Sequence, residues 1–284
     1  MRNKWRKIRV AALLAALLGL ASGCGQAGTA VPTDGDASRL SVYCFSAGKA
    51  DAFLLYTEHS AVLIDTGESG FGKTVVAKLQ ELGITKLDYL IITHFDKDHV
   101  GGAKKILESV EVGTVLQSNC PKDANAYNNY VAALATLEKE ALTVRQTLCF
   151  TLDGVQYTVD PPAREQYEKD ASNNSSLIVS VSHGSNRFLF MGDAEQARLE
   201  EFLSQSPGVC DFLKVPYHGH WQSILTQLLA EVSPTVAVIT SSEEEPEDAR
   251  TKTALTACGA EVWLTRDGPF TVVSDGSSLT VQED

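Results

Sequence analysis

Short apolar runs separated by polar or glycine-containing turns recur along the chain after residue 39, and they predict strands more often than helices. Residues 40–46, 52–57 and 61–65 are expected to form three consecutive strands. Leu90-Ile91-Ile92 is too short for a helix by itself and predicts a buried strand. Similar runs follow at 114–116, 155–159, 177–182, 187–191 and 212–216. The chain is therefore expected to be rich in β-structure.

Helical spacing appears between these runs. Residues 72–82 place Val75, Val76, Leu79 and Leu82 on one side, with Gly83 after the end. Helices are also expected to open at 103–108 and to cover 124–142 and 195–203, and helix and strand then alternate as far as Trp263. A closing hairpin is expected from 270–273 and 279–281 around Asp275-Gly276. Both halves combine strands with alternating helices and strands, which predicts an α/β protein, an αββα sandwich of two mixed sheets with outer helices.

The first 23 residues differ from the rest. Five basic residues precede an uncharged apolar run, 10–21, which is followed by Ser22-Gly23-Cys24. This order predicts a secretory signal, because twelve apolar residues are too few for a membrane span of about 20. The small residues before Cys24 resemble a bacterial lipoprotein signal, which implies lipidation of Cys24 and a place on the outer face of the cytoplasmic membrane. A secreted protein without lipid is the alternative. Residues 24–39 then read as a flexible tether, and residues 40–284 as the working domain.

Charge and cysteine content narrow the functional classes. The chain has 24 basic and 36 acidic residues, and without the five basic residues of the signal the remainder has 19 against 36, a net charge of −17. This balance disfavours binding of long duplex nucleic acid and fits a small extracellular substrate better. Besides Cys24, five widely spaced cysteines contain no Cys-x-x-Cys, which disfavours a disulfide framework or a zinc knuckle, although a single disulfide stays open. The oligomeric state stays open too.

Potential metal-binding side chains are most concentrated in residues 93–102, Thr-His-Phe-Asp-Lys-Asp-His-Val-Gly-Gly. His94, Asp96, Asp98 and His99 fall within six positions between the predicted strand 90–92 and the next helix. Open α/β folds place their sites on such loops, and imidazole with carboxylate is a ligand set for divalent metals. If the segment is extended, His94, Asp96 and Asp98 share one face and His99 follows at a bend. The sequence therefore predicts a metal site here.

Other polar residues end predicted strands and are expected near the same site. Asp65 should hold the metal loop from behind by hydrogen bonds. The segment 172–176, Asp193 and residues 217–220 offer further ligands, whereas His59 and His183 are expected in exposed turns. The carboxylate-rich set makes Mn²⁺ a rival to Zn²⁺, with one ion or a pair activating water.

Five motifs in order resemble the metallo-β-lactamase superfamily, whose loop is His-x-His-x-Asp-His. They are Ile64-Asp65-Thr66-Gly67, the loop at 93–102, Asn173-Asn174-x-Ser176-Leu177, Phe190-Met191-Gly192-Asp193 and Leu213-Lys214-Val215-Pro216-Tyr217-His218-Gly219. Asp96 in place of the second His, and the opening at 45–51, are similar to the metallohydrolase domain of ComEC-type DNA-uptake competence proteins. The resemblance covers most of residues 40–240 and implies the same sandwich fold.

The resemblance also implies roles for individual residues. Asp98, His99, Asp193 and His218 would hold one metal, and His94, Asp96, Asn174 and the shared Asp193 a second, weaker one. Asp98 would also orient or deprotonate the water. Tyr217 stands where the signature has His, so His218 is favoured as the ligand, with Tyr217 and His220 as candidates for contact with metal or substrate.

The function implied is a surface-anchored, metal-dependent hydrolase, of phosphodiester bonds first. Two alternatives stay open. One is hydrolysis of an acyl bond, as in lactonases and β-lactamases, and the other is a degenerate domain that binds metal or ligand without catalysis.

Overall fold

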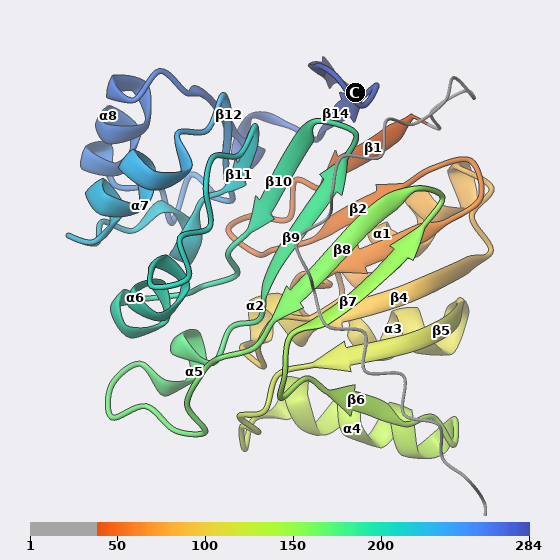
Figure 1. The fold of residues 1–284 in the computed structure, drawn as a ribbon. Coiled ribbons are helices and arrows are strands. Elements are labelled where there is room, and N and C mark those ends of the chain that lie inside the picture. Colours follow the sequence, from red (N-terminus) through yellow and green to blue (C-terminus); the bar gives the residue numbers. More distant parts are fainter. Residues whose placement is uncertain (1–38) are drawn as a thin grey trace, which may run out of the picture. The chain divides into compact units, whose positions relative to one another are not determined.

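Two β-sheets face each other in this protein (Figure 1), whose computed structural model describes residues 39–284. The predicted signal 1–23, Cys24 and the tether as far as residue 38 lie outside the described residues. Across 39–284, no helix has the length and apolar character needed to cross a membrane.

The first sheet of the described part has eight strands. In spatial order they are β15 (Leu279–Glu283), β14 (Phe270–Ser274), β1 (Leu40–Cys44), β2 (Phe53–Tyr56), β3 (Ala61–Ile64), β4 (Lys86–Ile92), β5 (Glu111–Gln117) and β6 (Ala141–Thr143). The strands from β3 to β6 run parallel, and the remaining pairs are antiparallel. The parallel strands bring their carboxyl ends to one edge of the sheet.

The second sheet of residues 39–284 has seven strands. Their order is β13 (Glu261–Leu264), β12 (Val236–Ile239), β11 (Phe212–Lys214), β10 (Asn186–Phe190), β9 (Ile178–His183), β8 (Val155–Asp160) and β7 (Leu148–Leu152). Here β10 to β13 are parallel, and β7, β8, β9 and β10 pair antiparallel. This sheet therefore also has parallel strands ending together.

Helices cover the outer face of each sheet (Figure 1). The first sheet packs against α1 (Gly72–Glu81), α3 (Ala103–Ser109) and α4 (Asn125–Thr136), and the second against α6 (Gln196–Leu203), α7 (Leu225–Val232) and α8 (Ala249–Ala257). The shorter elements are α2 (Lys97–Val100), α5 (Ala171–Asn174), η1 (Pro216–Gly219) and η2 (Thr265–Asp267).

Three apolar cores separate these four layers. Along β4, Ile91 belongs to the core between the sheets, whereas Leu90 and Ile92 belong to the core under the helices. Successive side chains of a strand point to opposite faces, so a strand buried on both faces needs the unbroken apolar run seen in the sequence. The predicted αββα sandwich of two mixed sheets is confirmed.

Some local predictions were wrong. The helix expected over 124–142 ends at Thr136, because the chain turns at Glu138, whose φ is 49°, and residues 141–143 form β6. Strand β7 was missed, although Asp153-Gly154 with φ of 46° and 78° is a typical two-residue hairpin turn between β7 and β8.

The two histidines expected in exposed turns have different surroundings. His59 is exposed, as expected. His183 ends β9 and is buried, with Nδ1 2.8 Å from the Ser274 hydroxyl. The prediction that His183 is exposed is wrong. The turn after His183 packs on Gly276, whose carbonyl accepts the Ser185 N–H at 2.7 Å.

Candidate metal centre

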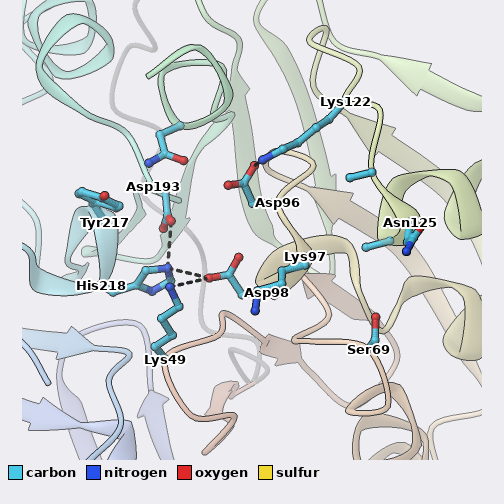
Figure 2. Close-up of a pocket in the computed structure, with 13 residues that line it drawn as sticks. Lys49, Ser69, Asp96, Lys97, Asp98, Lys122, Asn125, Asp193, Tyr217 and His218 are labelled. Atoms are coloured by element: carbon cyan, nitrogen blue, oxygen red, sulfur yellow. Dashed lines mark hydrogen bonds and ion pairs between the residues drawn. The ribbon is translucent and has the colours of Figure 1, made fainter. Parts of the chain in front are cut away.

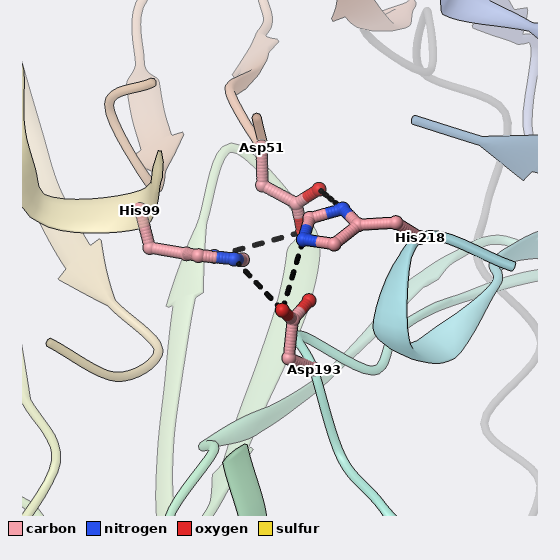
Figure 3. Close-up of side chains that lie close together, drawn as sticks. All are labelled: Asp51, His99, Asp193 and His218. Atoms are coloured by element: carbon pink, nitrogen blue, oxygen red, sulfur yellow. Dashed lines mark ion pairs between the residues drawn. The ribbon is translucent and has the colours of Figure 1, made fainter. Parts of the chain in front are cut away.

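Three imidazoles surround one carboxylate oxygen where the parallel strands of both sheets end. The Nε2 atoms of His218, His99 and His94 lie 2.9, 3.3 and 3.9 Å from Oδ2 of Asp193. His94 and His99 follow β4 of the first sheet, while Asp193 follows β10 and His218 follows β11 of the second. Figure 3 shows His99 and His218 directed at Asp193 from opposite sides. All four side chains are buried.

The other ring nitrogen of each histidine has a fixed partner. Nδ1 of His99 lies 2.8 Å from Asp65 Oδ2, and Nδ1 of His218 lies 3.0 Å from the Thr240 hydroxyl. Nδ1 of His94 lies 3.2 Å from the Thr93 hydroxyl. Such partners fix the orientation of a metal-binding imidazole and leave its Nε2 for the metal.

The Nε2 atoms themselves are buried without a hydrogen-bond partner among the described residues, for His94, His99 and His218 alike. Burial, and then the charge of His99, lower the pKa of His94 to about 4, so its imidazole is neutral near pH 7. Burial by itself lowers the pKa of His99 and His218, but the carboxylates, Asp193 foremost, outweigh it and raise both pKa values. Three inward Nε2 atoms beside a carboxylate are a set that fits a divalent ion, which would displace the protons of His99 and His218 on binding.

Asp98 reaches the centre from α2, not from an extended segment. Its Oδ2 lies 3.5 Å from His218 Nε2 and 3.5 Å from Lys49 Nζ. Burial by itself raises the pKa of Asp98, but contact with His218 and the charge of His99 outweigh it and hold that pKa well below its usual range. The alternation expected for His94, Asp96 and Asp98 is wrong, because a helical turn begins at Lys97 and brings Asp98 and His99 inward.

Asp65 supports this loop from behind. Its carboxylate accepts the Thr93 N–H at 2.8 Å and the Thr93 hydroxyl at 2.7 Å, besides contacting His99. Asp65 has a φ of 56°, a left-handed conformation that Asp tolerates better than most residues. Gly102 is needed nearby because a Cβ there would collide with the carbonyl oxygen of Thr66.

A buried carboxylate and a buried lysine at the centre were missed from the sequence. One ligand atom each of Asp51, His99, Asp193 and His218 lies within 4.8 Å of the others. Asp51, however, faces the Nδ1 side of His99 and His218, at 3.8 and 3.5 Å (Figure 3). It also binds Lys214 Nζ at 2.5 Å and the Thr240 hydroxyl at 2.7 Å. Asp51 is therefore placed to orient the imidazoles. A charge inside the apolar run 212–215 was the signal for Lys214.

The turn that carries His218 has an unusual backbone. Tyr217 and His218 have φ of 50° and 51°, and Gly219 follows with 75°. Left-handed residues without glycine cost on the order of 1–3 kcal/mol each and cluster at functional sites. The bend directs His218 into the centre, whereas Tyr217 lies over the pocket and His220 is exposed with its ring 4.7 Å from that of Tyr217. Neither Tyr217 nor His220 belongs to the buried group.

Two predicted ligands have other partners. Asp96 contacts Lys122 Nζ at 2.7 Å and lies 4.0 Å from His94 Nε2. The side chain of Asn174 is buried but accepts the Arg198 N–H at 3.0 Å and donates to the Lys169 carbonyl at 3.2 Å. The structure therefore does not bring the Asn174 amide to the metal centre.

A pocket of about 560 Å³ opens above the centre (Figure 2). Asp96, Asp98, Asp193 and His218 form part of its lining. The rest comes from Lys49, Ser69, Lys97, Lys122, Ala124, Asn125, Ala126, Asn173 and Tyr217. Two of these lysines pair with carboxylates of the centre, Lys49 with Asp98 at 3.5 Å and Lys122 with Asp96 at 2.7 Å. The exposed Lys97 pairs instead with Glu68 at 3.4 Å.

Comparison with known proteins identifies relatives of this arrangement. The family model for the metallo-beta-lactamase superfamily matches residues 46–241. Recombination protein 2 of Haemophilus influenzae is 31% identical over 207 residues, covering 70% of this chain and 24% of that protein. ComE operon protein 3 of Bacillus subtilis is 26% identical over 218 residues, covering 69% and 27%. The chain thus matches about a quarter of the length of these curated relatives.

A solved structure agrees with the fold. The metallo-beta-lactamase fold protein YhfI from Bacillus subtilis superposes with a TM-score of 0.55 and 15% identity, over 84% of this chain and 100% of that one. At this identity the likeness concerns the fold alone.

Proposed function

Since the chain belongs to the metallo-β-lactamase superfamily, we propose that it hydrolyses phosphodiester bonds with a divalent metal ion, on the outer face of the cytoplasmic membrane. The ion would be held by the imidazoles of His99 and His218 and the carboxylate of Asp193, with His94 and Asp98 beside them. Zn²⁺ and Mn²⁺ both suit this mixture of nitrogen and oxygen ligands.

The charge balance of the pocket carries this proposal. Lys49 pairs with Asp98 and Lys122 with Asp96, two of the three carboxylates of the lining, so a divalent ion would leave these groups with a net positive charge within an acidic chain. A positive pocket attracts anions, and local charges with low-dielectric walls strengthen that attraction. A phosphodiester is such an anion, and a pocket of about 560 Å³ holds a short segment of one better than a duplex.

Each group at the site would have its own role in the proposed hydrolysis. A bound divalent ion supplies a low pKa for water and polarises a phosphoryl oxygen. The carboxylate of Asp98, unprotonated near neutral pH, would orient the attacking water and accept its proton. Lys49 and Lys122 would hold the non-bridging oxygens of the substrate, and Tyr217 would cover the pocket.

The two alternative functions, an acyl hydrolase and a non-catalytic binding domain, would each require different features of this site. An acyl hydrolase would act on a lactam or lactone, and a lactone ring carries no charge for the lysines of the pocket to bind. A degenerate domain would have lost its ligands, whereas three Nε2 atoms here converge on Asp193.

We expect the full chain, purified and loaded with Mn²⁺ or Zn²⁺, to hydrolyse bis-p-nitrophenyl phosphate or short single-stranded DNA and to leave nitrocefin intact. Product would be followed by absorbance and by gel electrophoresis, with metal-stripped protein as the control. Turnover of nitrocefin alone would favour the acyl hydrolase, and metal binding without any turnover would favour the non-catalytic domain.

Anchoring at the membrane is proposed from the sequence around Cys24. Replacing Cys24 by serine removes the thiol that lipidation needs, so the Cys24→Ser protein should move from the membrane fraction to the soluble fraction of the producing cell. Immunoblotting of the two fractions measures this, with Cys149→Ser as the matched control. Retention of Cys24→Ser in the membrane fraction would contradict the anchor.

A further inference from the structure

The residues that would hold a second ion have different contacts from those that would hold the first. The superfamily resemblance assigns His94, Asp96, Asn174 and the shared Asp193 to this second subsite. Of these, His94 and Asp193 face the centre, with Nε2 and Oδ2 3.9 Å apart. The two remaining members, Asp96 and Asn174, would have to supply its other oxygen ligands.

The inward oxygen of Asp96 already has a cation beside it. Oδ1 of Asp96 is the atom that lies 4.0 Å from His94 Nε2, and the same Oδ1 accepts from Lys122 Nζ at 2.7 Å. The Ser172 hydroxyl also donates to this oxygen. Figure 2 shows Lys122 reaching down from the rim of the pocket onto Asp96. The ammonium group of Lys122 thus occupies the carboxylate oxygen of Asp96 that a second ion would need as a ligand.

Asn174 is held away by the neighbouring helix. Its carbonyl oxygen accepts the N–H of Arg198 in α6, and its amide nitrogen donates to the Lys169 carbonyl. Arg198 is itself fully buried, with its guanidinium 2.7 Å from Asp160 and bonded to the Ser176 carbonyl at 3.0 Å. Turning the Asn174 amide toward His94 would leave a buried N–H of α6 without its acceptor, which is unfavourable because a buried donor without a partner loses its hydration uncompensated.

From these contacts we propose that the chain binds one divalent ion, and that the ammonium group of Lys122 replaces the second ion as the positive charge that holds an anionic oxygen of the substrate. With Asp96 and Asn174 engaged by Lys122 and Arg198, the ligand atoms left at the centre are the three Nε2 atoms around Oδ2 of Asp193, enough for one ion. An ammonium has three N–H donors, so Lys122 can bind Asp96 and still donate to a phosphate oxygen in the pocket. The substrate part of this inference rests on the proposed function, and the metal count does not.

The metal count is tested by loading the full chain with excess Mn²⁺, removing unbound ion and measuring the metal by mass spectrometry alongside isothermal titration. One ion per chain is expected, with a single binding phase. Two ions per chain in the unmodified protein would overturn the inference, whether or not the protein turns over any substrate.

The role of Lys122 is tested by titrating inorganic phosphate into the Mn²⁺-loaded protein. Loss of a charged hydrogen bond should weaken phosphate binding by Lys122→Ala at least about tenfold. Lys122→Arg should keep most of the affinity, and Lys104→Ala, an exposed lysine of α3, should behave as the unmodified chain. Unchanged phosphate affinity in a folded Lys122→Ala protein would overturn the inference. Failure of the proposed function would appear separately, as absence of bis-p-nitrophenyl phosphate hydrolysis by the unmodified chain.

Discussion

Replacing Asp193 by asparagine should abolish tight metal binding and with it hydrolysis, while the fold survives. Asp193 Oδ2 is the atom that three imidazole nitrogens surround, and asparagine keeps its shape but loses its charge. Loss of a residue that merely supports a ligand already lowers metal affinity or activity about 10- to 100-fold, so loss of the central carboxylate should cost more. Thermal unfolding measured with and without Mn²⁺ reports the change directly.

The unmodified chain should gain about 2.7 kcal/mol in unfolding free energy when the ion is present at 100 times its dissociation constant. Asp193→Asn should show no such gain while its far-ultraviolet circular dichroism stays unchanged. Glu243→Gln is the matched control, because it removes one negative charge from a side chain that is 82% exposed. Metal-dependent stabilisation of Asp193→Asn equal to that of the control would refute the assigned centre.

Replacing Lys214 by methionine should destabilise the protein by about 3–5 kcal/mol, because it leaves the buried carboxylate of Asp51 without its counter-charge. Lys214 is 1% exposed, and its ammonium contacts Asp51 at 2.5 Å, the Gly192 carbonyl at 2.8 Å and Asp193 at 3.5 Å. Burial by itself lowers the pKa of Lys214, but Asp51 and Asp193 outweigh it and raise that pKa, so the side chain is charged. Urea unfolding measures the loss.

A double substitution separates the charge pair from simple loss of packing. If the cost comes from the unpaired carboxylate, Asp51→Asn combined with Lys214→Met should be more stable than Lys214→Met alone. Lys252→Met on α8 is the matched control, because this lysine is exposed. Equal stability of Lys214→Met and Lys252→Met would show that the buried pair contributes nothing.

The layered fold could be predicted because its causes are local. Each central strand is buried on both faces, which demands an unbroken apolar run, and such runs stand out in the sequence. The ligand loop was equally visible, since His94 and His99 lie close together after β4. The turn at Glu138 and the hairpin at Asp153-Gly154 were missed because they depend on two or three residues with positive φ.

The remainder of the centre depends on contacts between distant segments. Lys122 lies in a loop with no motif of its own, and its place on Asp96 follows only from the packing of α4 beside the ligand loop. Asn174 matches a family motif, but the N-terminus of α6 takes its carbonyl oxygen. Asp51 and Lys214 form an ion pair between the two sheets, and the spacing of these residues along the chain does not predict that pair.

The division of the centre between the two sheets also fixes when it can form. His94 and His99 leave the ribosome long before Asp193 and His218, and no pair from one sheet surrounds an ion by itself. Structural ligands bind metal tightly once the fold has brought them together. An ion bound at this centre would therefore be selected at the end of folding, by a completed cavity, from the cations of whichever compartment the chain has reached by then.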